Sequence, residues 1–503
     1  MSENTMYTET FDQKQLPSLG RTHPLGLVPL ALFMTAALLV AVTINQPQPI
    51  CFAGLIMDRL TAALALLVGG VGLACYRFSL RHLDGDPGQP RFLRLLNLTV
   101  ASAFLLMLAS NIILLFAAWT LTSYGLHGLL TYCTDRPERL RPARKKFLIS
   151  RLGDLMLLAA FGLIFIEWNT LDAHDFLGAN PTGPMATTVA LLLAGAALTK
   201  SAQVPFHSWL PETLESPTPV SAMMHAGIIN AGGALVLRFA PLMAQVPAAL
   251  LLLSLVGTLT AVLGAVAMWS QVKVKRTLAW STVSQMGFTM IQCGVAAFSA
   301  AALHMIGHGF YKAFRFLRAG DTPLASSKPI PPVRTLTLTL LGSALSIPVL
   351  MYGSRITGFE PLAHPGEMAL SVIVLLSVGQ TWVGLVGNVF SAGRLSIAFL
   401  LTLVVPLAAC GLYHAADTYF APVWGERAIA TGPVAWIAAV VPVLGFVGLT
   451  VLNATLPILG RVAGGRALYV YALNGFYFGA MADRVVDAVW PMGSDANKEI
   501  ARA

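Results

Sequence analysis

Long apolar segments follow one another along almost the whole chain, and they restrict its fold more than any other feature. Each run of about 17 to 25 residues is long enough to cross the hydrocarbon core of a bilayer. We place these segments near 24–44, 54–76, 92–109, 111–132, 147–168, 186–204, 219–241, 247–270, 274–298, 300–319, 334–352, 368–391, 396–413 and 431–457. Only 11% of the residues are charged, whereas a soluble globular chain carries about 25%. The sequence therefore predicts an all-α polytopic membrane protein with about 14 transmembrane helices.

The distribution of basic residues predicts the orientation of these helices. When alternate loops are counted, roughly 22 Lys and Arg residues fall on one side, and only Arg355 and Arg427 fall on the other. Basic loops stay in the cytoplasm, so we expect both termini there. The expected domains are a polar cytoplasmic N-terminus at 1–22, a transmembrane domain at 23–457, and a cytoplasmic amphipathic helix and tail at 458–503. The helix, near 469–490, is expected to lie on the membrane or against a partner.

An ammonium group stands at the end of one apolar segment. In ALLLAGAALTKSAQVPFHSWLP (190–211), Lys200 ends the apolar run, and Pro205 and Pro211 follow it. Proline removes backbone donors, and broken membrane helices are tolerated where they line a polar cavity. A lysine in mid-bilayer costs about 2.5–3.5 kcal/mol, so such a residue usually faces a pathway or a partner. We interpret Lys200 as a proton-relay residue beside a broken helix, with snorkelling as the weaker alternative.

Further ionisable residues lie within apolar segments. His304, His308 and Lys312 in AALHMIGHGFYKAFRFL recur at i, i+4 and i+8, which places them on one helix face. We favour a hydrogen-bonded proton path there, and a metal site or a polar helix contact are the alternatives. His225 is weaker on its own, because a single membrane histidine is as often a packing residue. Asp154 lies near the start of the segment 147–168.

The sequence has no pattern typical of an enzyme. It has no phosphate-binding glycine loop, no nucleophile elbow and no pair of carboxylates on one helix face. The five cysteines are scattered without metal-ligand spacing, so we expect no metal or other cofactor in this chain. Energy input would therefore come from an ion gradient or a partner.

Three motifs carry a family resemblance. TKSAQVPFHSWLPETLESPTPVSAMMHAG, VKRTLAWSTVSQMGF and HMIGHGFYKAFRFL resemble the antiporter-like membrane subunits of NADH–quinone oxidoreductase and of multisubunit cation/proton antiporters. The resemblance covers about residues 50 to 320 and fades beyond them. It implies two inverted five-helix repeats, each with a broken helix and a proton half-channel. It assigns roles in the proton pathway to Lys200, His225, His304, His308, Lys312 and Asp154.

Two departures from the family pattern indicate a particular branch. Thr120 in FAAWTLTSYGLHG stands where pumping members carry the glutamate that partners the lysine. The second broken helix would lack its lysine, and the nearest candidate is Arg355, which stays charged at any working pH. Together with KKFLISRLGDL and LNGFYFGAMADR, these features are similar to the membrane subunit of DAB-type inorganic carbon accumulation systems of the bacterial inner membrane.

That branch implies a machine of two proteins. The membrane subunit, which is not itself an enzyme, would conduct a cation down its gradient. We expect this cation to be H⁺, and the sequence leaves Na⁺ open as the alternative. Its large soluble partner of the DabA type, a zinc protein resembling carbonic anhydrase, would hydrate CO₂ to bicarbonate. We expect protons to enter near Lys200 and His225, to pass His304, His308 and Lys312, and to leave by a route that Arg355 gates. The alternatives are a proton-translocating subunit of a redox complex or multisubunit antiporter, and a non-conducting membrane scaffold.

Overall fold

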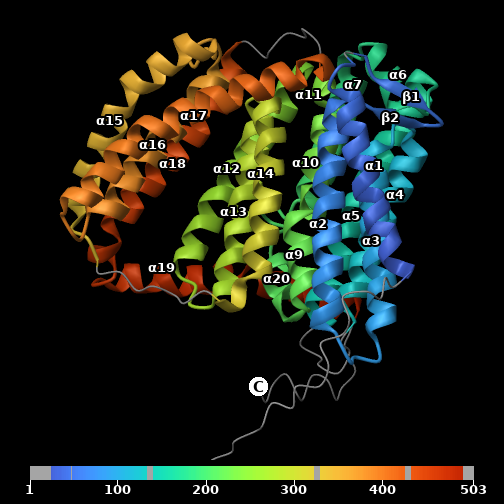
Figure 1. Cartoon of the computed structure of the whole chain (residues 1–503), viewed down its shortest axis with the longest axis horizontal. Helices are drawn as coiled ribbons and strands as arrows, with labels where there is room; N and C mark the ends of the chain where they lie inside the picture. The colour runs from blue at the N-terminus through green and yellow to red at the C-terminus, as the bar shows by residue number, and fades with distance from the viewer. Residues whose placement is uncertain (1–23, 47, 133–139, 322–328, 425–431, 491–503) are drawn as a thin grey trace, which may run out of the picture.

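The computed structural model describes residues 24–46, 48–132, 140–321, 329–424 and 432–490, and it is a bundle of long helices (Figure 1). The predicted all-α class is confirmed. Within these ranges, a short antiparallel hairpin is the one departure, with β1 (Ile50–Phe52) paired to β2 (Leu55–Met57). The predicted N-terminal segment 1–22 and the end of the tail, 491–503, lie outside the described residues.

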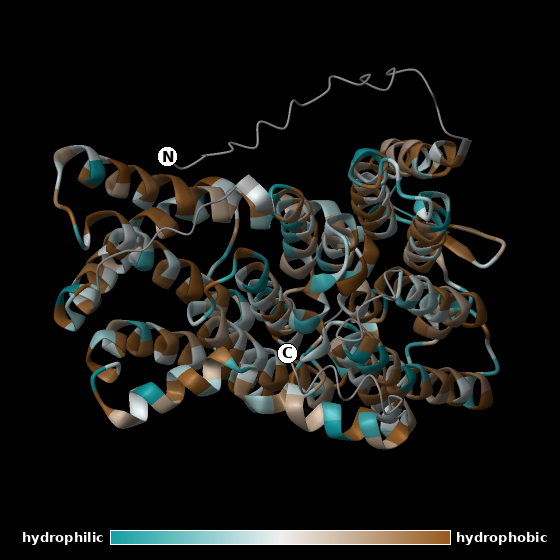
Figure 2. Cartoon of the chain, turned by 90° about the horizontal axis from the view of Figure 1, so that it is seen from below, coloured by the Kyte–Doolittle hydropathy of each residue, from teal (hydrophilic) through white to brown (hydrophobic). Residues whose placement is uncertain are grey.

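Eleven helical segments of the described chain are long and apolar enough to cross a membrane. They are α2 (Arg59–His82), α3 (Gln89–Leu108), α4 (Ile112–Leu130), α5 (Leu140–Trp168), α7 (Gly183–Lys200), Thr218–Arg238, α12 (Pro247–Trp269), α15 (Pro332–Thr357), α16 (Pro365–Val386), α17 (Ala392–Trp424) and α18 (Pro433–Leu459). α1 (Leu27–Thr43) is shorter, and α13 (Val274–Gly294) and α14 (Phe298–Leu317) are more polar. With these three, the structure has the long segments that the sequence predicts, and Figure 2 shows apolar residues, in brown, on many of these helices.

Shorter elements connect or interrupt these helices. They are η1 (Pro24–Gly26), α6 (Ala173–Gly178), α8 (Trp209–Glu212), η3 (Thr213–Glu215), α9 (Thr218–Ala226), η4 (Ile228–Asn230), α10 (Ala231–Arg238), α11 (Ala240–Gln245), η5 (Ala319–Asp321), α19 (Ala463–Leu473), η6 (Gly475–Tyr477) and α20 (Phe478–Val489). Side-chain caps fix some starts. Asp58 and Thr61 form a reciprocal capping box at the start of α2, which satisfies two backbone donors.

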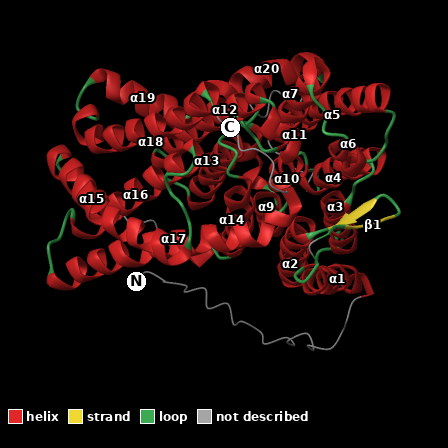
Figure 3. Cartoon of the chain, turned by 90° about the horizontal axis from the view of Figure 1, so that it is seen from above, coloured by secondary structure: helices red, strands yellow, loops and turns green. Residues whose placement is uncertain are grey.

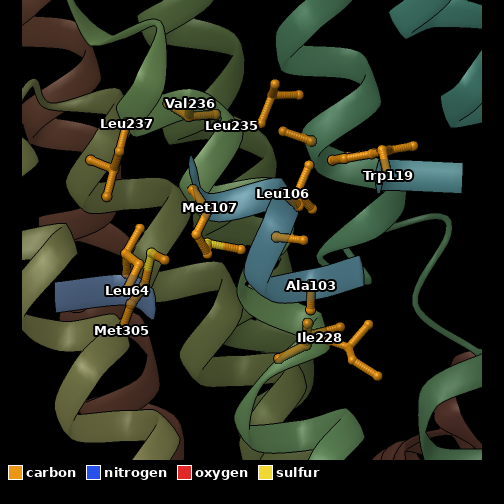
Figure 4. Packing of buried hydrophobic residues seen from close by; sticks show 14 of the residues in the cluster. Leu64, Ala103, Leu106, Met107, Trp119, Ile228, Leu235, Val236, Leu237 and Met305 are labelled. Carbon is orange, nitrogen blue, oxygen red and sulfur yellow. The ribbon is translucent and has the colours of Figure 1, made fainter. Parts of the chain in front are cut away.

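Helices α1 to α14 share one large apolar core. Figure 4 shows part of it, where Leu64, Ala103, Met107, Leu235 and Met305 approach one another from four different helices. Close packing requires small residues where backbones nearly touch. A Cβ on Gly257 or Gly287 would lie 2.7 Å or less from backbone atoms of the partner helix, so these glycines let α12 and α13 pack closely.

The second half of the chain departs from two predictions. A second broken helix was expected, but α15 is one continuous helix with Pro348 inside it. A single proline removes one backbone donor, which a helix of this length tolerates. The segment predicted at 396–413 is much longer, because α17 continues to Trp424. Its last turns bury Ala416 and Phe420 against the large core, and the Trp424 indole donates to the Leu237 carbonyl.

The C-terminal amphipathic segment is also corrected. It is two helices rather than one, because Phe476 and Tyr477 have positive φ values of 55° and 59° between α19 and α20. Figure 3 shows α19 and α20 along one edge of the molecule. α20 packs against α5 of the same chain, so its polar face is already covered. We call this end of the bundle, where α2 ends and α5 and α13 begin, the basic end (lower end in Figure 1).

Candidate functional site

The predicted break lies directly after Lys200. α7 ends at this residue, and residues 201–208 are not helical before α8 begins at Trp209. The free backbone groups of the break find partners: the Val204 amide donates to Thr260 Oγ1 on α12 at 3.0 Å. The first broken helix predicted from Lys200 and the two prolines is therefore confirmed.

Lys200 is bound by neutral oxygens only. Its Nζ donates to the Trp119 carbonyl at 2.9 Å and to Ser123 Oγ at 2.8 Å, and it lies 4.4 Å from the centre of the Trp119 ring. Thr120, at the position of the family's glutamate, instead donates to Phe116 and Ala117 of its own helix. In the described part of the chain, no carboxylate lies within ion-pair distance of Lys200.

Asp154 reaches Lys200 only through an intermediate residue. Trp119 donates from Nε1 to Asp154 Oδ1 at 2.9 Å, and Arg151 forms an ion pair with the other oxygen at 2.8 Å. The Trp119 side chain thus joins Asp154, and its carbonyl joins Lys200. This geometry places Asp154 in the same polar cluster as Lys200, one residue away from direct contact, and its role in a proton pathway stays a prediction.

Lys146 belongs to this cluster and was missed from the sequence. Its Nζ donates to the Ser123 carbonyl at 2.8 Å, and the residue is only 3% exposed. Ser123 therefore lies between two lysines, bound through its hydroxyl to Lys200 and through its carbonyl to Lys146. The sequence does contain a pattern that could have placed Lys146 in the cluster: Lys146, Ser150 and Asp154 recur at i, i+4 and i+8, on one face of α5. We call Trp119, Ser123, Lys146, Asp154 and Lys200 the lysine site.

The second cluster contains the predicted histidines. His225 on α9 is fully buried and stacks on Phe316 with ring centres 4.3 Å apart. Neither of its ring nitrogens has a hydrogen-bond partner among the described residues. Lys312 is also fully buried, and its Nζ donates to the Leu278 carbonyl at 3.1 Å. α9 packs along α14, which brings His225 to the face that carries Lys312.

His304 and His308 continue this face of α14. Their ring centres lie 5.8 Å apart, and His304 also contacts Phe288. The described residues contain no group of three histidine, cysteine or carboxylate side chains placed to bind a metal. We call His225, His304, His308 and Lys312 the histidine site. It joins the lysine site through packing of α7 on α10, where Ser201 Oγ donates to the Ile229 carbonyl at 2.9 Å.

Arg355 lies outside both sites. It is exposed near the C-terminal end of α15, a helix of the second half. Its assignment as a gate stays a prediction.

A third polar cluster, also missed from the sequence, lies at the basic end. Lys145 is 1% exposed, and its Nζ lies 2.5 Å from Glu212 Oε2, 2.7 Å from Asp483 Oδ1 and 3.1 Å from the Gly479 carbonyl. Burial raises the pKa of Glu212 above its ordinary value, and the Lys145 ammonium opposes that shift. The cluster ties α5 and α8 to α20, so the amphipathic helix is held by buried charge.

Comparisons with known proteins show which family the chain belongs to. The family model described as NADH:quinone oxidoreductase/Mrp antiporter, TM, matches residues 109–354, which hold both sites. The chain is 33% identical over 450 residues to "Probable inorganic carbon transporter subunit DabB2" of Halothiobacillus neapolitanus, covering 86% of this chain and 80% of that protein. It is 38% identical to DabB1 of the same organism over 314 residues, 60% of this chain and 56% of that one, so this match spans less than two thirds of the relative.

A solved structure is also similar. The "Structure of Mrp complex from Dietzia sp. DQ12-45-1b" matches with a TM-score of 0.52 and 25% identity, over 95% of this chain and 59% of that one. The helical membrane architecture is thus shared with a multisubunit antiporter.

Proposed function

Because the chain belongs to the family of DabB inorganic carbon transporter subunits, within the NADH:quinone oxidoreductase/Mrp antiporter superfamily, we propose that it conducts H⁺ through the membrane to drive inorganic carbon accumulation. The observation that supports this most directly is Lys200. Lys200 is buried at a helix break, and its ammonium group is bound by neutral oxygens alone.

The proton route follows from the two sites. Lys146 lies on the side of the basic end, Ser123 separates it from Lys200, and the histidine site lies beyond the α7–α10 contact. Lysine and histidine can each accept and release a proton, and hydrogen-bonded hydroxyls can pass one between them. A carboxylate beside Lys200 would stabilise its ammonium form and slow release of the proton. Thr120, which stands at the position of the family's glutamate, supplies no such charge. This arrangement suits downhill conduction better than pumping.

The chemistry of carbon capture would lie in a second protein. We assign the hydration of CO₂ to bicarbonate to a large soluble zinc protein of the DabA type, bound at the cytoplasmic face of a bacterial inner membrane. Proton flow through this chain would supply the energy that makes accumulation one-directional. In this assignment the basic end faces the cytoplasm, in agreement with its excess of Lys and Arg.

The first experiment identifies the partner. The protein is purified in mild detergent through an affinity tag, and what accompanies it is measured by mass spectrometry and zinc analysis. A single large soluble zinc protein supports the proposal. Small membrane subunits, or flavin and iron–sulfur proteins, would contradict it and favour a subunit of a redox complex or multisubunit antiporter.

The second experiment tests conduction. The two-protein complex is reconstituted in liposomes, a potassium diffusion potential is applied, and internal pH is followed with a dye. Lys200→Met is expected to abolish proton uptake, whereas Arg394→Met removes an exposed cation outside both sites and is expected to leave it unchanged. Equal uptake by the Lys200 variant and the unaltered protein would instead indicate a scaffold.

A further inference from the structure

A large basic pocket lies at the basic end, separate from both proton sites. Its volume is about 460 Å³, and the cations that line it are Arg141, Lys273, Lys275 and Arg276. Arg141 comes from the start of α5, Lys273 from the turn between α12 and α13, and Lys275 and Arg276 from the first turn of α13. We call these four residues the basic pocket. The α8–η3 segment supplies two carboxylates to the same wall, Glu212 and Glu215.

The charges of the pocket are only partly neutralised by the chain itself. Arg141 forms an ion pair with Asp487 at 2.9 Å, and Glu212 is held by Lys145. Among the described residues, no carboxylate lies within ion-pair distance of Lys273, Lys275 or Arg276. Lys273 and Arg276 are exposed, and Lys275 donates to Thr218 Oγ1 at 3.1 Å. Excess positive charge therefore faces the opening.

The size of the pocket indicates what it binds. A water molecule occupies roughly 30 Å³ of liquid, so this volume exceeds a single small anion many times over. Two or three carboxylate side chains on one peptide segment would fill it and reach cations on both walls. Six charged side chains line the pocket together with Pro142, Pro211 and Leu214, and an excess of cations among them is typical of a surface that guides a partner by electrostatic complementarity.

We propose that the basic pocket is the docking site for an acidic segment of the soluble cytoplasmic partner. This inference rests on the proposed function, and it adds which surface of the chain binds the partner and that the contact is between cations and carboxylates. The amphipathic helix is a weaker candidate, because Asp483 and Asp487 on its polar face already pair with Lys145 and Arg141.

Two exposed cations allow a test with little risk of unfolding. The variant Lys273→Ser/Arg276→Ser removes two charges that have no carboxylate partner in the described chain, and Arg461→Ser/Arg466→Ser is the matched control. Both control residues are exposed, and they flank the start of α19 at the same end of the bundle. The Kd of the detergent-purified protein for its isolated soluble partner is measured at several salt concentrations. We expect at least a tenfold weaker Kd and a shallower salt dependence for the pocket variant, with less than a threefold change for the control.

Carbodiimide cross-linking of the complex gives a second measurement. The reagent joins an amine directly to a carboxylate, so Lys273 or Lys275 is expected to be linked to an Asp or Glu of the partner. An unchanged Kd in the pocket variant would overturn the docking inference while leaving the proposed function intact. The docking inference would also be overturned by a pocket variant that binds the partner normally but loses bound phosphatidylglycerol, which would indicate a lipid site. A variant that binds the partner normally but is no longer stabilised by bicarbonate would overturn it in the same way and indicate an anion site. Absence of any soluble partner from the unaltered protein would remove the proposed function itself.

Discussion

Replacing Lys145 by Met should release α20 from the bundle. The ammonium binds Glu212 and Asp483 at 2.5 and 2.7 Å, and the two carboxylates are 28% and 25% exposed. Removing one partner of a fully buried ion pair costs about 3–5 kcal/mol. Partial exposure screens the remaining carboxylates, so we expect about 2–3 kcal/mol here. Met retains most of the apolar stem, which keeps the loss of packing small.

The free energy of local opening can be measured by hydrogen exchange. A loss of about 2–3 kcal/mol corresponds to roughly 30- to 150-fold faster amide exchange in Phe478–Val489. Arg484→Met is the matched control, because it removes an exposed charge from α20 itself and should leave exchange nearly unchanged. Adding Asp483→Asn to Lys145→Met should recover part of the loss, since it removes one unpaired carboxylate. Unaltered exchange of α20 in Lys145→Met would refute the view that buried charge holds this helix.

Three further changes test the two sites and their connection. Ser123→Ala removes the side-chain acceptor of Lys200 and should slow proton uptake by liposomes about tenfold or more. Ser123→Thr keeps the hydroxyl and should retain most of the uptake rate. Equal uptake rates for Ser123→Ala and the unaltered protein would remove Ser123 from the proton route. His225→Phe keeps the stacking on Phe316 but no ring nitrogen, so uptake should fall while the melting temperature changes little; normal uptake would make His225 a packing residue. Gly232→Ala would place a Cβ against the Ala197 carbonyl and Ser201 Oγ, and should destabilise the protein by about 1–3 kcal/mol in thermal unfolding, whereas Gly307→Ala, which meets no atom within 4 Å, should not.

Much of the fold could be predicted, because the length of an apolar run and the thickness of a bilayer are linked by simple geometry. The break after Lys200 could be predicted because a buried lysine followed closely by two prolines combines a costly charge with lost backbone donors. The length of α17 could not be predicted, because polar residues such as His414 and Asp417 are typical of the end of a membrane segment. The helix continues through them since Ala416 and Phe420, on another face, pack against the core.

The composition of the lysine site could be predicted only in part. The sequence shows that Thr120 replaces a glutamate, but it does not show what Lys200 binds in its place. That depends on how α4 and α7 are rotated about their axes, which brings Ser123 rather than Thr120 to the ammonium. Lys146 was visible as a helical repeat with Asp154, yet its position among the basic residues before 147 favoured an exposed loop.

The first two turns of α5 connect the lysine site, the Lys145 cluster and the basic pocket. Side chains of neighbouring helical residues point about 100° apart, so Lys145 and Lys146 face different surroundings from the same turn. Lys146 binds Ser123 in the lysine site, Lys145 binds Glu212 and Asp483, and Arg141, one turn earlier, lines the basic pocket. A partner that displaces the Arg141–Asp487 pair therefore acts on the turn of α5 that positions Lys146. The basic pocket and the lysine site are therefore linked by fewer than two turns of one helix.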